Sequence, residues 1–296
     1  MFEIRRLVDD DLPFAQQLSG IAGWNQTKAD WRRLIDLGGE GCFLIQCDGQ
    51  RAGTATTIVF ADRLAWIGMV LVHPSFRRRG LATMLLRRCL EHLRSGRCIG
   101  CVKLDATVEG QPLYAKLGFQ HDYQLARWEG NVAELLVGSA FGDADLSVAR
   151  VIEVSRSDDW LERDRRVFAA DRNCLLRRLA TESLAAIEIP GHGYGMLRAG
   201  SRAVYLGPLV AADDATGRKL VAQLLMSLRQ RAGADLKSPQ VDRVYWDIPR
   251  SNAAAERLAQ QLGMVQQRPL VRMWTGDANI ADDPSSQWAI AGPETG

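Results

Sequence analysis

Val70-Leu71-Val72-His73-Pro74-Ser75-Phe76-Arg77-Arg78-Arg79-Gly80-Leu81-Ala82 is the stretch of sequence that decides the fold. It continues a nearly unbroken apolar run of strand length, Ala65 to Val72, which predicts a central strand covered on both faces. From Leu81 onward, apolar residues recur at three- and four-residue spacing, so a helix follows at once. The stretch therefore predicts a buried strand that enters a basic turn and opens directly into a helix.

The basic turn has the chemistry of an anion-binding site. Backbone N–H groups and the positive end of the helix dipole would converge there on a ligand. Gly80 removes a Cβ where the backbone must approach that ligand, and Arg77 to Arg79 add charge suited to a diphosphate. A solvated basic turn is the plain alternative. A second feature is Tyr114, on a short helix expected over Leu113 to Leu117 after the next strand.

This combination resembles the GNAT superfamily of acyl-CoA-dependent N-acyltransferases. The signature of that family is Arg or Gln, two residues, Gly, one residue, then Gly or Ala, and Arg77, Gly80 and Ala82 fill it. The resemblance implies a layered α/β (α+β) fold with a mixed, largely antiparallel central sheet flanked by helices. It also implies an N-acetyltransferase that uses acetyl-CoA as co-substrate and needs no metal.

The resemblance gives roles to individual residues. The edge of the strand would hydrogen-bond the pantetheine arm, and backbone N–H groups near Val70 and Leu71 would stabilise the oxyanion. Tyr114 would protonate the departing thiolate, for which an unperturbed pKa of about 10 is suitable. The residues expected to bind acetyl-CoA are Val70, Leu71, Val72, Arg77, Arg78, Arg79, Gly80, Leu81, Ala82, Thr83 and Thr107.

The general base and the acceptor site are less defined. No glutamate lies in the strand Ala65 to Val72, where many relatives carry the base; Asp105 is the candidate, with an ion-paired or surface aspartate as the alternative. Trp24, Asn25 and Asp30 lie between the first two expected helices, the region that roofs the acceptor site in GNAT proteins. Trp24 could wall a pocket and Asn25 or Asp30 could bind the amine or its polar neighbours, or all three could serve only in helix packing and capping.

The second half of the sequence repeats the same order of elements at lower fidelity. Val204 to Val210 repeats the apolar strand, and Leu220 to Leu228 repeats the long helix. The apolar residues Trp288 to Ala291 indicate that the end of the sequence packs on the protein. The expected organisation is a catalytic domain over 1–135, a linker over 136–148, a second GNAT-like domain over 149–276 and a tail over 277–296.

The second copy keeps the order of elements and loses the chemistry. Asp213 and Asp214 stand where the first copy has arginines, so a diphosphate would meet like charge. Ala259 stands in place of Tyr114, and Gly217→Glu is expected to leave cofactor stoichiometry and turnover nearly unchanged. The sequence predicts one coenzyme A per chain, bound by the first domain, and a structural second domain.

Composition limits the choice of partners. The 37 Lys and Arg nearly balance the 35 Asp and Glu, so no overall field attracts nucleic acid or an anionic membrane. Without an apolar run of about 18 residues or a signal-peptide pattern, we expect a cytoplasmic protein. The C-x-x-C pair of Cys98 and Cys101 lacks further ligands at a suitable spacing, which favours ordinary thiols over a metal site.

The expected partner is a small-molecule primary amine, and a homodimer is left open. Two other functions remain as alternatives. A non-catalytic sensor would bind acyl-CoA without turning over any amine. A nucleic-acid-associated protein would use Arg77, Arg78, Arg79, Arg87 and Arg88 as a phosphate patch, which the small net charge disfavours.

Overall fold

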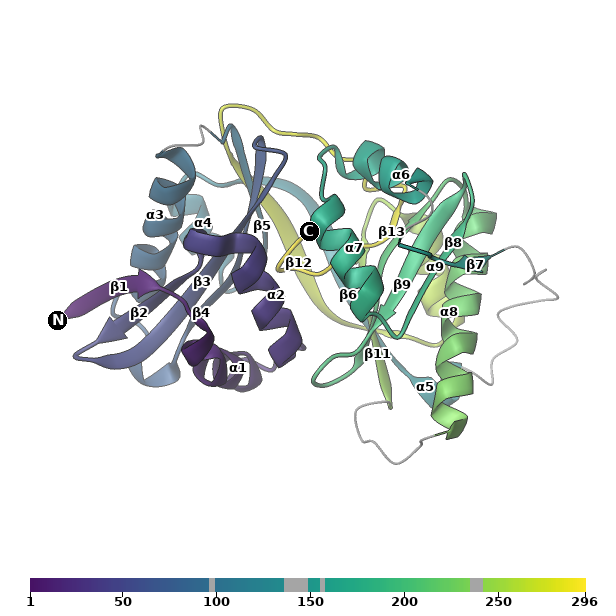
Figure 1. Ribbon diagram of the computed structural model, residues 1–296, viewed down its shortest axis with the longest axis horizontal. Helices are drawn as coiled ribbons and strands as arrows, with labels where there is room; N and C mark the ends of the chain where they lie inside the picture. The colour runs from purple at the N-terminus through teal and green to yellow at the C-terminus, as the bar shows by residue number, and fades with distance from the viewer. Residues whose placement is uncertain (96–98, 136–148, 155–157, 235–241) are drawn as a thin grey trace. The chain divides into compact units, whose positions relative to one another are not determined.

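The computed structural model describes residues 1–95, 99–135, 149–154, 158–234 and 242–296 (Figure 1). These residues form two compact units, each built from more than one segment of the chain. The first unit comprises residues 1–122, 272–280 and 293–296, and the second comprises residues 123–271 and 281–292. The units therefore do not follow the contiguous domain boundaries expected from the sequence. The expected linker, 136–148, lies outside the described residues.

The first unit is a mixed sheet with the strand order β1-β2-β3-β4-β5-β12. Strands β1 to β4 pair antiparallel, and β4 and β5 pair parallel. The strands are β1 (Phe2–Arg6), β2 (Phe43–Cys47), β3 (Gln50–Phe60), β4 (Leu64–Val72), β5 (Cys101–Ala106) and the end of β12 (Val265–Gly276). The helices are α1 (Leu12–Ile21), α2 (Lys28–Gly38), α3 (Leu81–Arg94) and α4 (Gln111–Lys116).

Helix α3 covers one face of this sheet. The ring of Phe43 on β2 lies 5.7 Å from the ring of His92, and the guanidinium of Arg88 lies 4.8 Å above it. Ala55 of β3 is the register partner of Phe43 and shares its face. Since side chains alternate along a strand, the next residue, Thr56, points to the opposite face.

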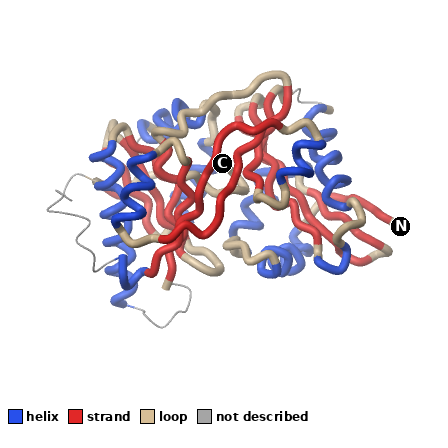
Figure 2. The backbone as a smooth tube through the Cα atoms, turned by 180° about the vertical axis from the view of Figure 1, so that it is seen from behind, coloured by secondary structure: helices blue, strands red, loops and turns tan. Residues whose placement is uncertain are grey.

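The second unit repeats this plan with the strand order β12-β6-β11-β10-β9-β8-β7. Its strands are β6 (Gln120–Asn131), β7 (Arg150–Val151), β8 (Ala185–Ile189), β9 (Gly193–Arg198), β10 (Val204–Ala211), β11 (Arg243–Pro249) and β13 (Gln287–Ala289), which pairs with β10. Its helices are α5 (Val132–Leu135), α6 (Asp159–Phe168), α7 (Asn173–Glu182), α8 (Asp214–Ala234) and α9 (Ala253–Gln261). Figure 2 shows the strands and helices of the chain from behind.

Helices α6 and α8 pack on opposite faces of the second sheet. A Cβ on Gly193 or Gly195 would lie within 3.1 Å of a leucine of α8, so these two positions of β9 face that helix. Tyr194, between them, points the other way and donates its hydroxyl to Asp164 of α6. The close approach of α8 to the sheet therefore depends on residues without a side chain.

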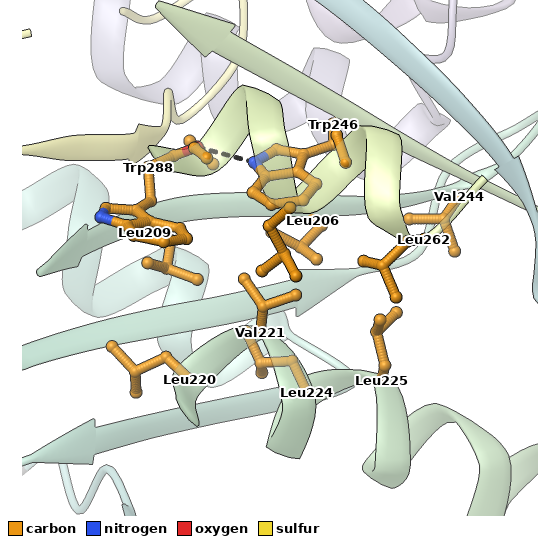
Figure 3. Packing of buried hydrophobic residues seen from close by; sticks show 14 of the residues in the cluster. Leu206, Leu209, Leu220, Val221, Leu224, Leu225, Val244, Trp246, Leu262 and Trp288 are labelled. Atoms are coloured by element: carbon orange, nitrogen blue, oxygen red, sulfur yellow. Dashed lines mark hydrogen bonds between the residues drawn. The ribbon is translucent and has the colours of Figure 1, made fainter. Parts of the chain in front are cut away.

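The core of the second unit is a continuous apolar cluster between α8, α9 and the sheet (Figure 3). It includes Leu206, Leu209, Leu220, Val221, Leu224, Leu225, Val244, Trp246, Leu262 and Trp288. The Trp246 indole N–H donates to the backbone carbonyl of Trp288 at 2.6 Å. The apolar segment near the end of the sequence is thus part of this core, as its composition indicated.

Each unit incorporates a strand from the other half of the sequence, and a buried Asp–Arg pair binds that strand. In the first unit, Arg272 of β12 donates through Nε and one terminal nitrogen to both oxygens of Asp105 on β5, at 2.9 Å each. In the second unit, Arg127 of β6 makes the same bidentate contact with Asp247 of β11, at 2.8 and 2.6 Å. This exchange of β6 and β12 is the reason that contiguous boundaries do not describe the units.

Among the described residues, no helix is long and apolar enough to cross a membrane. Cys42, Cys47, Cys89 and Cys101 are buried free thiols, Cys174 is exposed, and Cys98 lies outside the described residues.

We predict that Arg272→Ala lowers the free energy of unfolding of the first unit by about 3–5 kcal/mol, because the buried carboxylate of Asp105 would lose its bidentate charged partner. Urea unfolding followed by circular dichroism measures this change. The double variant Asp105→Leu/Arg272→Met removes both charges and should recover most of the loss. A single variant as stable as the wild type would show that the pair does not hold β12 in place.

Candidate active site

Strands β4 and β5 separate well before β4 ends. Their parallel ladder pairs Leu64–Trp66 with Cys101–Lys103, whereas β4 continues to Val72. The register between β4 and β3 also shifts in this region, and Met69 has a φ of 50°, which marks a bulge. The bulge turns the backbone of the following residues, so this part of β4 offers an edge to a ligand in the gap between the two strands.

The turn after β4 holds its shape through specific backbone contacts. Pro74–Phe76 form one 3-10 turn, and Arg77 donates through Nε to the carbonyl of Val72 at 3.2 Å. Gly80 immediately precedes α3 with a φ of 79°, in the left-handed region that residues with a side chain rarely adopt. Apart from Gly80 and its two chain neighbours, no described residue has an atom within 4 Å of the position that a Cβ on Gly80 would occupy. The turn therefore leaves open space at the start of α3.

A concave pocket of about 220 Å³ occupies this open space. It is lined by Val72, Phe76, Arg77, Arg78, Gly80, Leu81, Ala82 and Thr83. The first-turn N–H groups of α3 have no partner within the helix, as in every α-helix. Within the described residues, Arg77, Arg78 and Arg79 are exposed and form no ion pair with a carboxylate. The pocket thus combines free positive charge with a helix N-terminus, which suits the diphosphate of coenzyme A.

The pocket brings together seven of the residues that the sequence selected and adds Phe76, which sequence reasoning missed. Phe76 lies under the guanidinium of Arg79, 5.6 Å from the ring centre, so its part in the turn is to pack against a basic side chain. Thr107 lies outside this pocket lining; its carbonyl accepts the N–H of Gly110 at 3.0 Å and helps to start α4.

Tyr114 lies on α4, half-buried, with its ring 6.0 Å from the ring of Phe119. Burial, and to a smaller extent the neighbouring thiol of Cys89, raises the pKa of Tyr114 to about 12. The phenol is therefore protonated throughout the neutral range and can donate a hydrogen bond or a proton.

Asp105 and Asp30, two candidates for amine chemistry, both have structural partners. The side chain of Asp105 is fully buried and bound by Arg272, so the ion-pair alternative accounts for it better than a role as base. Asp30 accepts the backbone N–H of Thr27 at 2.7 Å in a capping box and pairs with Arg33. These contacts favour the capping alternative for Asp30. Asn25 is buried and Trp24 half-buried in the loop before α2.

Residues 4–119 match a family model described as the acetyltransferase (GNAT) family, and residues 161–289 match a second described as an acetyltransferase (GNAT) domain. The chain belongs to the GNAT family. It is an acyl-CoA-dependent N-acetyltransferase with two GNAT domains in tandem.

Relatives of similar length support this assignment. The uncharacterized N-acetyltransferase YitH of Bacillus subtilis (strain 168) is 24% identical over 227 residues, 75% of this chain and 77% of that protein. A holothin acyltransferase of Pseudoalteromonas sp. (strain SANK 73390) is 23% identical over 224 residues, 74% of this chain and 72% of that protein. A crystal structure from Pyrococcus horikoshii, provisionally assigned as an acetyltransferase, has a TM-score of 0.82 at 21% identity. It covers 100% of this chain and 96% of that chain, which shows a shared fold.

In the second GNAT domain, the carboxylate of Asp213 caps the N-terminus of α8. Asp213 accepts the backbone N–H of Thr216 at 2.7 Å, and this hydrogen bond is the main cause that lowers the pKa of Asp213. Asn252, the counterpart of Thr107, likewise caps α9 through the N–H of Ala255 at 2.9 Å. Both contacts are ordinary helix caps, and Asp213 stands where a diphosphate would bind.

The second domain also fills the gap between its central strands. Strand β10 pairs parallel with β11 only over Val204–Leu206, and beyond this point β13 pairs with Leu209 and Val210. The carbonyl of Ile290 lies 2.4 Å from the position of a Cβ on Gly207, so the chain itself lies against β10 there. A pantetheine arm would have to displace this strand.

Gly217, whose substitution by Glu the sequence predicts to leave coenzyme A binding and turnover nearly unchanged, is closely packed in the second unit. Gly217 lies in the first turn of α8, one residue after Thr216, and not in the turn before the helix. A Cβ there would lie 2.0 Å from the indole of Trp288. Because the indole is part of the buried core, a glutamate at this position would disrupt the second unit whatever its effect on coenzyme A.

We predict that Gly80→Glu lowers the affinity for acetyl-CoA by about a hundred-fold or more, since it places a carboxylate beside the diphosphate and loses charge-assisted contacts of about 1.5–3 kcal/mol each. Isothermal titration calorimetry measures the affinity. Gly49→Glu is the matched control, because Gly49 has a φ of 78° and equally open surroundings in a hairpin turn. Equal acetyl-CoA affinity in the two variants would show that the turn from Arg77 to Gly80 does not bind acetyl-CoA.

Proposed function

We propose that the protein transfers an acetyl group from acetyl-CoA directly to a primary amine of a small molecule, in the first GNAT domain. One observation carries the proposal: β4 leaves β5 after Trp66, and its remaining stretch leads into the arginine-rich turn and the open N-terminus of α3. A long, thin ligand with a diphosphate at one end fits this arrangement. The corresponding gap in the second domain is filled by β13.

The residues of the first domain would divide the work as follows. The N–H groups at the start of α3 and the side chains of Arg77 to Arg79 bind the diphosphate. The free edge of β4 from Val70 to Val72 binds the pantetheine arm and places N–H groups near the thioester carbonyl. The amine attacks that carbonyl, and Tyr114 donates to the thiolate as the carbon–sulfur bond breaks.

The choice of a small-molecule acceptor is supported by a relative that covers most of this chain. The Pseudoalteromonas relative is named for acylating holothin. In this chain, the loop between α1 and α2 offers the half-buried indole of Trp24 and the buried amide of Asn25 as candidates for acceptor contacts.

A panel of primary amines, including polyamines, aminoglycosides and arylalkylamines, tests the proposal. Coenzyme A release should depend on one class of amine, and mass spectrometry should detect its product with one added acetyl group. Saturable acetyl-CoA binding without product from any amine would favour a non-catalytic sensor instead. Product formed with peptides and with none of the small amines would favour a protein acceptor.

We predict that Tyr114→Phe lowers kcat by about ten- to a thousand-fold and leaves the Kd for acetyl-CoA nearly unchanged, because the hydroxyl acts mainly as the thiolate forms. Tyr123→Phe, which removes a hydroxyl bound to Asp282 in the second unit, is the control and should keep full activity. Since the pKa of Tyr114 is about 12, the wild type should show no alkaline loss from this group below about pH 11. Full activity in Tyr114→Phe would show that the hydroxyl takes no part in catalysis and that Tyr114 serves only in packing.

A further inference from the structure

The last described segment of the chain, 293–296, belongs to the first unit and lies against β4. The Trp66 indole N–H donates to the carbonyl of Pro293 at 3.0 Å. A Cβ on Gly68 would lie 2.7 Å from the carbonyl oxygen of Glu294, closer than any real contact. Gly68 thus provides the space that this segment occupies. Because Gly68 is the register partner of Thr56, the segment lies on the face of the sheet opposite α3.

Glu294 is buried there, with a relative exposure of 7%. The side-chain amide of Gln26, in the loop between α1 and α2, donates to Glu294 Oε2 at 2.9 Å. Gln26 is itself only 8% exposed, and its Oε1 has no hydrogen-bond partner among the described residues. The hydroxyl of Thr56, 1% exposed, also has none within the described ranges. The buried carboxylate of Glu294 therefore contacts Gln26, and Thr56 is the register partner of Gly68, which the backbone of Glu294 covers; Gln26 and Thr56 each hold a buried oxygen that still needs a partner.

An amine supplies what these groups require. A protonated primary amine carries a positive charge and three N–H donors, which match the carboxylate of Glu294 and the acceptor oxygens of Gln26 and Thr56. Buried polar groups without partners are costly, so a ligand that satisfies them binds with specificity for its N–H groups. A neutral apolar ligand would leave the same groups unsatisfied.

The location of this cluster also suits the reaction. Gly68 directly precedes the bulge at Met69, and Val70, which we place at the thioester carbonyl, is two residues away. Two residues of strand span about 7 Å. Strand β4 itself carries no glutamate, and Asp30 and Asp105 are bound by Arg33 and Arg272. Glu294 reaches the same strand from a distant part of the sequence.

We propose that Glu294, Gln26 and Thr56 form the subsite for the acceptor amine and that Glu294 is the general base; the inference rests on the proposed function. One proton passes from the ammonium to Glu294, and the freed lone pair forms the carbon–nitrogen bond. The carbon–sulfur bond then breaks, and the thiolate takes a proton from Tyr114. The second amine proton returns to Tyr114 through water, and Glu294 releases the first to solvent.

Three variants test the subsite. Glu294→Gln keeps the shape and removes the charge, Glu294→Asp keeps the charge on a shorter side chain, and Glu91→Gln makes the same change on the exposed surface of α3. Rates are measured from pH 6 to 10 with the best amine of the panel. Binding of benzylamine to protein saturated with coenzyme A is measured separately by thermal shift, and acetyl-CoA affinity by calorimetry.

For Glu294→Gln we expect kcat/KM for the amine to fall about a hundred-fold or more at pH 7, with acetyl-CoA affinity unchanged. The deficit should narrow toward pH 10, where the free amine loses its proton without help. Glu294→Asp should recover part of the rate, Glu91→Gln should match the wild type, and benzylamine should stabilise the wild type but not Glu294→Gln.

Failure of the inference is distinguishable from failure of the proposed function. If the wild type acetylates an amine and Glu294→Gln shows the same kcat/KM and pH profile, the inference is wrong and the function stands. If benzylamine stabilises the wild type, not Glu294→Gln, and no amine is acetylated, the subsite stands and the function fails. Absence of any benzylamine stabilisation in the wild type, or equal stabilisation in both proteins, overturns the subsite.

Discussion

The separation of two parallel strands is the constraint on which the rest of the structure depends. In each unit, the central parallel pair has only three residue pairs before the strands part, β4 from β5 and β10 from β11. Backbone groups exposed in such a gap need hydrogen-bond partners. In the second unit, β13 provides them from within the chain. In the first unit, none of the described strands pairs with β4 in this gap, and β4 leads directly to the basic turn, so the partner can be a ligand.

The two units also differ in the charge at the N-terminus of the helix that follows the central strand, α3 in the first unit and α8 in the second. The first unit places Gly80 and three exposed arginines before α3, which leaves the helix N-terminus open to an anion. The second places the carboxylate of Asp213 on the N–H groups of α8, so the same helix end is already neutralised. We propose that one fold is thereby used twice, once as the catalytic domain and once as a domain whose ligand gap is occupied by the chain itself.

The sequence predicted the parts of the site that depend on neighbouring residues. The apolar strand, the basic turn, Gly80 and the helix that follows lie within one short stretch, and the structure groups Val72, Arg77, Arg78, Gly80 and the start of the helix around one pocket. The sequence also showed that Asp213 stands in the second copy where the first copy has an arginine. These features follow from local geometry, which hydrophobic spacing and glycine position report directly.

Contacts between distant residues could not be read in the same way. The partner of Asp105 is Arg272, on a strand exchanged from the second half, and the partner of Gln26 is Glu294, near the other end of the sequence. Neither pairing leaves a periodic signal. The close packing of Gly217 against Trp288 is of the same kind, because it joins residues far apart in the sequence.

The central claim is that only the first domain can hold coenzyme A, and the stoichiometry of binding tests it most directly. Coenzyme A titrated calorimetrically into the full chain at known active concentration should give one site per chain. Two sites per chain would contradict the account, because the second domain could then open β13 and accept the cofactor. No binding at all would contradict it equally.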